Sequence, residues 1–319
     1  MARRRVIGID AGGTKLLGGV VDGDLMVEHR VHRLWRGEDR REVIDVMADA
    51  AGEARAGASD VAAVGFGIPA QVDFARGVAL ASNHLPLNGV AFREVMAERL
   101  GLPVAVDNDA NAALLGEMRH GAARGSSEVA LLTLGTGVGG ALALGGSIYR
   151  GRDGIGVELG HIPIDLDGPP CPGRCDGRGC LEALVAGPAI AARGEREARE
   201  DSSSALAAEL AEGRAITGAH VTELAHDGDQ AAMRAITETG RLLGIGLVAI
   251  VNLFAPQVIV MGGGAMRGGD LLLDPAREVV AERALEPARD EVRVVAAELA
   301  EEAGMIGAAE LARDLEASK

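Results

Sequence analysis

Two stretches that lie far apart in the chain repeat the same succession of short elements. In each, an apolar run ends in a glycine-rich turn, and strand-like runs follow. The first stretch covers residues 4–32 and the second covers residues 129–149. Apolar runs of about four to eight residues bounded by Gly and Asp predict strands, and Asp22-Gly23-Asp24 predicts a hairpin turn. An internal repeat of this kind predicts a chain built from two similar halves.

The first glycine turn follows residues 4–10 and carries the groups that a phosphate site needs. Two glycines let backbone N–H groups approach a phosphate, a hydroxyl and a lysine charge follow, and an aspartate at the strand end could hold Mg²⁺ through water. This is not a Walker loop, because the GxxxxGK[ST] spacing is absent. A plain hairpin turn is the structural alternative. The candidate nucleotide-binding residues are Asp10, Gly12, Gly13, Thr14 and Lys15.

The second glycine turn, at 135–140, formally satisfies the GxGxxG pattern of dinucleotide sites. We disfavour that interpretation, because Gly145 and Gly146 interrupt the segment in which a helix would have to follow. Glycine turns on two similar halves suggest instead a nucleotide whose phosphates are gripped from both sides. A third glycine run follows a predicted strand at 257–261, where a nucleoside ring could lie against the backbone, although a strand-to-helix turn also explains it. The candidates are Gly135, Thr136, Gly137, Gly262, Gly263 and Gly264.

All three cysteines lie in one stretch rich in Gly and Pro. The spacing Cys171-x3-Cys175-x4-Cys180, with turn-forming residues between the ligands, lets three sulfurs converge on one tetrahedral zinc ion. His161, upstream across a span that predicts a turn, is the natural fourth ligand. Such a closed set predicts a structural metal rather than a catalytic one. Ordinary reduced thiols are the alternative, and a disulfide fits less well because the count is odd and the context looks cytosolic.

Two glutamates flank this cysteine cluster. Glu158 lies three residues before His161, and Glu182 lies two residues after Cys180. A zinc ion there would bring two carboxylates beside an imidazole N–H, an arrangement suited to vicinal sugar hydroxyls. Solvated surface carboxylates are the alternative for either glutamate taken alone.

A predicted strand at 102–106 leads into Asp107, Asn108 and Asp109 at the start of a helix. Asp109 is a candidate general base, because a carboxylate in a cleft can accept the proton of a sugar hydroxyl that attacks a γ-phosphorus. A helix N-cap is the alternative at this position. Two further turns, at 69–73 and 81–86, follow strand-like runs, where α/β folds place ligands, although ordinary loops explain them as well. The candidate substrate-binding residues in these turns are Ala70, Gln71 and Asn83.

Charge and hydropathy exclude several classes of protein. The 319 residues suffice for two domains, and 32 basic against 47 acidic side chains give a net charge of -15. That charge opposes nonspecific binding to nucleic acid or to anionic lipid. No apolar run reaches the length of a membrane span, and residues 1–5 lead straight into a strand rather than into a signal sequence. We therefore expect a soluble cytoplasmic protein.

These motifs in combination resemble the ROK family of sugar kinases and repressors, within the actin/Hsp70/hexokinase superfamily. The resemblance spans essentially the whole chain. It rests on IDAGGTK at 9–15, GIPAQVD at 67–73, VDNDAN at 106–111, LGTGVGGALALGGSIYRG at 134–151, ELGH at 158–161, GCLEAL at 179–184 and APQVIVMGGG at 255–264. It implies an α/β, two-domain, actin/Hsp70/hexokinase-like (ribonuclease H-like) fold with an interdomain cleft and a structural zinc knuckle. We expect a small domain at 1–118, a larger domain carrying the knuckle at 119–303, and a closing helix at about 304–319 that packs on the first.

The resemblance also implies phosphorylation of a hexose hydroxyl, typically at C6, with ATP and Mg²⁺. In that family the residue matching Asp109 is the catalytic base, and the sugar is contacted by residues matching Asn83, Asn108, Glu158, His161 and Glu182. Residues 10–15 and 135–137 match its phosphate loops, and residues 262–264 its adenosine side. Several positions differ from the usual family pattern. Val157 and Ala70 stand where Gly is usual, Asn88 stands where an aromatic residue often follows the Leu-Pro turn, and three residues rather than one separate Cys171 from Cys175.

We therefore expect a glucokinase. An N-acetylhexosamine or N-acetylmannosamine kinase and a fructokinase are the alternatives among enzymes, and a non-catalytic sugar sensor is the alternative of another class. Family repressors carry a winged helix before the kinase-like body, whereas this sequence opens on the first strand, so we do not expect a nucleic-acid partner. By analogy we expect a homodimer or a larger homo-oligomer.

Overall fold

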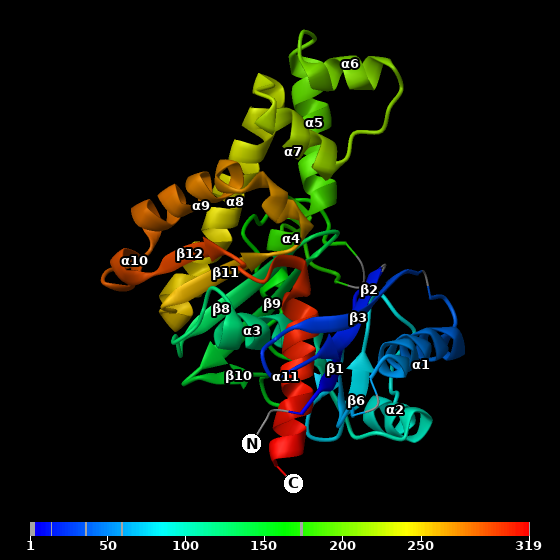
Figure 1. The fold of residues 1–319 in the computed structure, drawn as a ribbon. Coiled ribbons are helices and arrows are strands. Elements are labelled where there is room, and N and C mark those ends of the chain that lie inside the picture. Colours follow the sequence, from blue (N-terminus) through cyan, green and yellow to red (C-terminus); the bar gives the residue numbers. More distant parts are fainter. Residues whose placement is uncertain (1–3, 14, 36, 59, 173–174, 319) are drawn as a thin grey trace.

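The computed structural model describes residues 4–13, 15–35, 37–58, 60–172 and 175–318. Within these ranges the chain forms two five-stranded mixed sheets with helices packed around them (Figure 1). The predicted Thr14 position lies outside the described residues.

The first sheet has the strand order β3-β2-β1-β4-β7. Its strands are β1 (Val6–Ala11), β2 (Lys15–Val21), β3 (Val27–Leu34), β4 (Val64–Ile68) and β7 (Val104–Asn108). Strands β1, β4 and β7 run parallel, while β2 and β3 are antiparallel additions at one edge. Nearly every residue of β1 and β4 is buried, as the continuous apolar runs in the sequence predict for strands covered on both faces.

The second sheet repeats this plan with the order β10-β9-β8-β11-β12. Its strands are β8 (Val129–Leu134), β9 (Val138–Leu144), β10 (Ser147–Tyr149), β11 (Val258–Gly262) and β12 (Arg293–Ala296). Here β8, β11 and β12 are parallel, and β9 and β10 form the antiparallel edge. The matching order of parallel and antiparallel strands bears out the internal repeat that the glycine turns predict.

Helices cover both sheets and join them. Figure 1 shows α1 (Arg40–Ala56) and α2 (Phe92–Leu100) on the outer side of the first sheet, whereas α3 (Asp109–His120) lies between the two halves. The closing helix α11 (Ala303–Ala317) lies beside β1 and α3, and it buries most of its first ten residues. A Cβ on Gly65 of β4 would lie 1.7 Å from the Ala308 carbonyl oxygen, so this glycine permits the close contact between helix and sheet.

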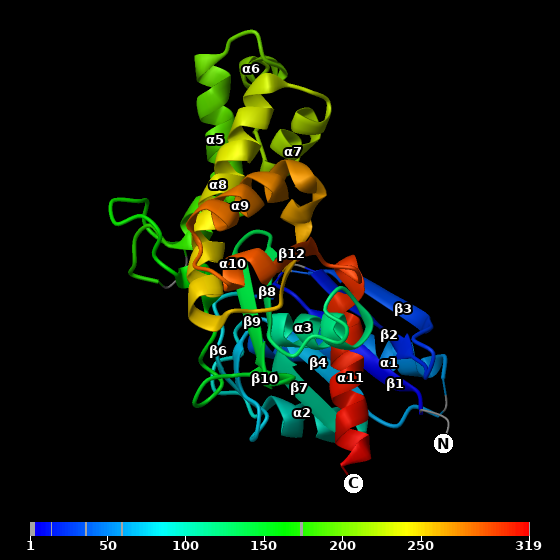
Figure 2. The ribbon, with the colours of Figure 1, turned by 90° about the vertical axis from the view of Figure 1, so that its left-hand side faces the viewer.

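The remaining helices belong to the second half. They are α4 (Leu181–Val185), α5 (Gly187–Glu200), α6 (Ala205–Ala211), α7 (Gly218–His226), α8 (Gln230–Phe254), α9 (Asp270–Arg283) and α10 (Ala288–Glu291). In both ribbon views, α5, α6 and α7 lie with the start of α8 at one end of the molecule, away from the sheets (Figures 1 and 2).

One helix corrects an expectation from the sequence. By length and composition α8 could cross a membrane, with a mean hydropathy of 1.4 over an 18-residue window, whereas the sequence analysis expected no such run. Half of that window is buried inside the protein. Its buried face belongs to the core of the second half, together with apolar residues of α5, α7 and α9. A core helix of this kind meets the same criterion as a membrane span.

Strands β5 and β6 and helix α2 were not predicted. Turns were expected at 69–73 and 81–86, whereas β5 (Gln71–Asp73) and β6 (Val78–Ala81) form a two-stranded hairpin, and α2 follows it. The proposed division into domains at residues 118 and 303 stays a prediction, although α11 packs on the first sheet as that prediction requires.

Candidate active site

The parallel strands of the first sheet bring three of the predicted segments to one edge. Asp10 on β1 pairs with Gly67 on β4, and Gly67 pairs with Asp107 on β7. Because parallel strands end on the same side, the first glycine turn, the 70–71 turn and the start of α3 all emerge together. This is the edge of an α/β sheet where ligands bind.

The sequence left Asp109 as either a helix cap or a general base, and the structure gives the cap to its neighbour Asn108. Asn108 is the N-cap of α3, because its side-chain oxygen accepts the backbone N–H groups of Ala110 and Asn111. Its Nδ2 donates to the Asp109 carboxylate at 3.0 Å and to the Ala70 carbonyl at 3.3 Å. Asp109, the first residue of the helix, is therefore not needed as the cap and is oriented by Asn108.

The environment of Asp109 suits a proton acceptor. The pKa of Asp109 is raised to about 6, mainly by burial and to a smaller extent by the charge of Glu158. The Ala110 N–H, at 2.9 Å from the carboxylate, and the charge of His84 act in the opposite direction. A carboxyl group with a pKa near 6 is ionised at neutral pH yet more basic than an ordinary aspartate, which favours general-base chemistry.

A second carboxyl group lies close to the first. The pKa of Asp10 is raised to about 7, mainly by burial and then by the charge of Asp109, while the charge of Lys15 acts in the opposite direction. Gly304, in the first turn of α11, makes room for this side chain, because a Cβ there would lie 2.4 Å from Asp10 Oδ2. Lys15 itself pairs with Glu301 at 2.5 Å. Two neighbouring carboxyl groups that both resist ionisation favour a cation between them.

The first glycine turn has two neighbours that the sequence analysis did not identify. The indole Nε1 of Trp35 donates to the Gly12 carbonyl at 2.9 Å. A Cβ on Gly13 would lie 3.1 Å from His84 Cβ, so this turn faces the 82–88 loop. No motif marks Trp35, and its only signal was that it is the single tryptophan of the chain. His84 lies in the turn predicted at 81–86 but was not itself named as a candidate.

The second glycine turn lies beside the third glycine run, because β11 pairs with β8 in parallel and places Gly262 opposite Thr133. Gly263 has a φ of 87°, and a Cβ there would lie 2.3 Å from the Leu134 carbonyl oxygen, so only glycine fits. The Gly135 N–H donates to the Gly137 carbonyl within the turn. The two predicted nucleotide segments in this half are thus neighbours, and Thr136, in the first of them, is exposed.

The predicted sugar-binding residues come from both halves. Gln71 Nε2 donates to Glu158 Oε1 at 3.0 Å, which joins the start of β5 to the ELGH motif. Val157, directly before Glu158, has a φ of 67°, a left-handed conformation that explains why glycine is usual there in the family. Glu182 lies further along, where its Oε2 accepts the Val138 N–H at 2.7 Å. Glu182 therefore contacts the second glycine turn.

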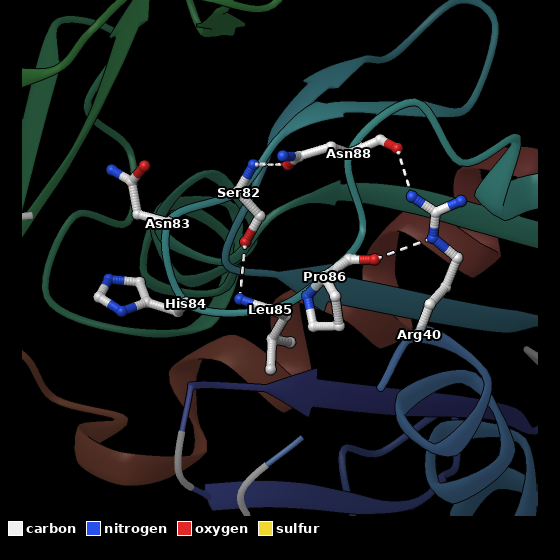
Figure 3. A pocket seen from close by; sticks show the side chains of 7 residues that line it. All are labelled: Arg40, Ser82, Asn83, His84, Leu85, Pro86 and Asn88. Atoms are coloured by element: carbon white, nitrogen blue, oxygen red, sulfur yellow. Dashed lines mark hydrogen bonds between the residues drawn. The ribbon is translucent and has the colours of Figure 1, made fainter. Parts of the chain in front are cut away.

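Asn83 lies on the rim of a cavity of about 330 Å³. Figure 3 shows Asn83 and His84 on one side of the 82–88 loop and Arg40 on the other. Arg40 donates to the carbonyls of Pro86 and Asn88 at 3.1 and 3.0 Å, and the backbone N–H of Ser82 donates to Asn88 Oδ1 at 2.7 Å. The loop that carries Asn83 is thus held from the start of α1. The cavity is lined by Arg40, Ser82, Asn83, His84, Leu85, Pro86 and Asn88.

The four predicted metal ligands converge. One donor atom from each of His161, Cys171, Cys175 and Cys180 lies within 4.8 Å of all the others. Cys171 Sγ is 3.3 Å from His161 Nδ1, and Cys175 Sγ is 4.0 Å from Cys180 Sγ. Tetrahedral zinc with bonds of about 2.0 and 2.3 Å requires ligand separations of roughly 3.5–3.8 Å. The donor set therefore fits zinc, and the wider gap between Cys171 and Cys175 does not prevent the sulfurs from meeting.

The thiol chemistry of the cluster is consistent with a bound cation. Burial and the adjacent sulfurs of Cys180 and Cys175 raise the pKa of Cys171, and burial likewise raises the pKa of Cys180. Thiolates so close together need a positive charge to offset them at neutral pH.

Comparison with known proteins identifies relatives of this chain. The ROK family model matches residues 6–315. A glucokinase from Thermotoga maritima is 35% identical over 285 residues, covering 88% of this chain and 89% of that protein. A glucokinase from Streptomyces coelicolor is 36% identical over 278 residues, covering 85% and 86%.

Among solved structures, a ROK family glucokinase from Streptomyces griseus in complex with glucose and AMPPNP has a TM-score of 0.87 and 35% identity, over 97% of this chain and 99% of that one. This similarity confirms the two-domain hexokinase-like α/β fold predicted from the sequence. With a family model matched over nearly its whole length, the chain belongs to the ROK family.

Proposed function

We propose that the protein is an ATP-dependent hexose kinase that converts glucose to glucose 6-phosphate. The proposal rests on the surroundings of Asp109. Asn108 caps α3 in its place and donates a hydrogen bond that orients its carboxylate. The pKa of Asp109 is raised to about 6, mainly by burial. A sugar sensor has no need of such a base. The similarity to glucokinases from two organisms supports glucose as the acceptor.

In the proposed reaction the Asp109 carboxylate accepts the proton of the sugar 6-hydroxyl as its oxygen attacks the γ-phosphorus. The bond from that phosphorus to the β,γ-bridging oxygen breaks, and ADP leaves. Gln71, Asn83, Asn108 and Glu158 hold the sugar hydroxyls on one side, and the backbone of Ala70 fixes Asn108. Holding acceptor and donor in line supplies much of the rate enhancement in such transfers.

The glycine turns would hold the nucleotide. Residues 12–13 of the first half and 136–137 of the second, in the two glycine turns, would offer backbone N–H groups to the phosphates, and residues 262–264 would offer a surface without side chains to the adenosine. Mg²⁺, bound with ATP, would neutralise charge that develops on the phosphates. Asp10, with Asp109 nearby, is the residue of this chain that would hold it, through water.

Zinc would complete the sugar side. His161 Nδ1 faces the cysteine sulfurs, which leaves Nε2 to donate to a sugar hydroxyl. The metal would thus fix the tautomer and the position of an imidazole that also contacts substrate.

We also propose that the protein is a homo-oligomer in the cytoplasm. Light scattering would test the oligomeric state, and cell fractionation would test the localisation.

A coupled assay of ADP release tests the function directly. Wild-type protein and Asp109→Asn are compared over glucose, mannose, fructose, N-acetylglucosamine and N-acetylmannosamine, with ATP and Mg²⁺. We expect glucose to give the highest kcat/KM and the variant to be inactive. A higher value for an amino sugar or fructose would replace glucose by one of the alternative kinases. Absence of turnover on every sugar, with sugar binding intact by calorimetry, would favour the sensor.

A further inference from the structure

Arg150 links the two halves of the molecule next to the proposed base. It follows β10 in the second half, and its Nε and Nη2 both donate to Asp107 Oδ2 on β7, at 2.9 and 2.6 Å. Asp107 is 1% exposed and lies two residues before Asp109. None of the motifs discussed above assigns a role to this ion pair.

Both partners of the pair are fully engaged. The Arg150 guanidinium lies 3.8 Å from the centre of the Phe74 ring, and its Nη1 donates to the Ile148 carbonyl. The other oxygen of Asp107 accepts the Asn108 N–H at 2.8 Å and Asn111 Nδ2 at 3.0 Å, in the first turn of α3. The network needs a flat group with several donors in fixed directions, which arginine supplies and lysine does not.

Arg150 also begins the segment that carries Glu158. The segment 150–158 contacts β5 of the first half at Gly154, where a Cβ would lie 1.8 Å from the Val72 carbonyl oxygen. The segment ends where Glu158 accepts the hydrogen bond from Gln71. One end of the segment is therefore fixed on Asp107 and the other is placed beside the predicted sugar site.

We propose that Arg150 is a positioning residue for catalysis: its grip on Asp107 sets the placement of Asp109 relative to Glu158. The expected effects on kcat and KM rest on the proposed hexose kinase function. Asp107 orients the backbone of Asn108 and the first turn of α3, and Arg150 orients the segment that ends in Glu158. The Arg150–Asp107 contact thereby sets the positions of both the proposed base, Asp109, and the sugar-binding Glu158, which come from different halves.

Arg150→Lys tests this proposal, because it keeps the charge and removes the fork and the stacking on Phe74. Arg152→Lys is the matched control, since Arg152 is exposed and pairs with the adjacent Asp153. Hydrogen–deuterium exchange of peptides covering 107–116 and 150–158 is measured without substrate. The kcat and the KM values for glucose and ATP are then measured for each variant.

We expect faster exchange in both peptides of Arg150→Lys, a kcat lower by about 10- to 100-fold, a glucose KM raised severalfold and an ATP KM within twofold of wild type. Arg152→Lys should match the wild type throughout. If Arg150→Lys does not fold, Asp107→Asn weakens the same pair and should show the same pattern.

Two results would overturn the proposal. One is unchanged exchange in the 107–116 peptide. The other is a variant that unfolds at a lower urea concentration but whose kcat and glucose KM, when folded, stay within twofold of wild type. That result would make the ion pair purely structural. The exchange comparison needs no turnover, so it decides the placement of the two segments even if the wild type proves not to phosphorylate a hexose.

Discussion

Gln71 and Glu158, which are 87 positions apart in the sequence, are joined by a hydrogen bond of 3.0 Å from Nε2 to Oε1. Gln71 opens β5, at the end of the first sheet's central strands, and Glu158 precedes the 3₁₀ turn Leu159–His161 of the second half. The bond spans the proposed sugar site, so each of its partners can orient the other toward a sugar hydroxyl.

Removing this bond should weaken sugar binding. We expect Gln71→Ala to raise the glucose KM by about 3- to 10-fold with little change in the ATP KM, since one hydrogen bond contributes about 0.5–1.5 kcal/mol. Gln71→Glu should be worse, because it places a second negative charge beside Glu158. Steady-state kinetics with both substrates measure the effect. If Gln71→Glu were no worse than Gln71→Ala, the contact with Glu158 would not be the cause.

Glu158 and Glu182 should differ in what their removal affects. Glu158 contacts Gln71 on the sugar side, whereas Glu182 accepts the Val138 N–H of the second glycine turn. We expect Glu158→Ala to raise the glucose KM alone. Glu182→Ala should raise the KM values for glucose and ATP together, each by about tenfold, as losing a hydrogen bond to a charged group costs about 1.5–3 kcal/mol. An unchanged ATP KM in Glu182→Ala would contradict the role of this contact.

The pH dependence of turnover should report Asp109. Because the general base must be ionised, and burial raises the pKa of Asp109 to about 6, kcat/KM for glucose should fall about tenfold per pH unit below 6 and level off above 7. A profile measured from pH 4.5 to 8.5 checks this. A profile flat down to pH 5 would exclude Asp109 in this role. Asp109→Asn should lose about 10²- to 10⁴-fold in kcat while calorimetry still detects glucose binding.

Local chemistry explains which elements the sequence could predict. β8 and α11 were predicted within a residue or so, because each is an apolar run or periodic helix bounded by clear turn residues. Helix α2 was missed because Ala91, the residue before it, gives no side-chain cap and hence no N-terminal signal. Strands β5 and β6 have three and four residues, too few for a period to be recognised.

The same distinction holds for the site. The cysteines lie within one short loop, so their spacing alone predicted a common ligand. The contacts of Trp35 with Gly12 and of Arg150 with Asp107 join distant segments that meet only through the topology of the sheets. At Asp109 the sequence left a base and a cap as alternatives; the hydrogen bonds of Asn108 assign the cap to Asn108, and the base stays a proposal.

Loss of the metal should affect stability and sugar binding together. We expect Cys175→Ser, or removal of zinc by a chelator, to lower the free energy of unfolding by more than about 2 kcal/mol and to weaken glucose binding, since His161 would lose the ion that fixes its ring. Asp176→Asn, an exposed change in the same loop, is the control. Mass spectrometry of bound metals, urea unfolding and calorimetry measure these effects. Fully active, equally stable protein without zinc would contradict the assignment.

Asp10 should lower stability at neutral pH in the absence of ligands. Burial and the charge of Asp109 raise its pKa from 3.8 to about 7, so the folded state holds this proton over a pH range in which the unfolded chain has lost it. The unfolded state binds fewer protons there, and the wild type therefore loses stability as the pH rises from about 4 to 7.

Asp10→Asn keeps the shape of the protonated side chain and removes that loss. Each pH unit in this range costs at most about 1.4 kcal/mol, and because Asp10 is mostly buried but keeps some contact with solvent, we expect a total gain of about 1–3 kcal/mol. The stability difference between Asp10→Asn and wild type should be near zero at pH 4, grow up to pH 7 and then stay constant. Asp49→Asn, on the exposed face of α1, controls for the lost charge. Urea unfolding across this pH range, without Mg²⁺, measures the difference in free energy of unfolding between the two proteins. A gain that was already complete at pH 4 would show that desolvation of the carboxylate is not its source.

Asp10→Asn should also lose most of its activity with MgATP, because the carboxylate that destabilises the free protein is the one proposed to hold the cation.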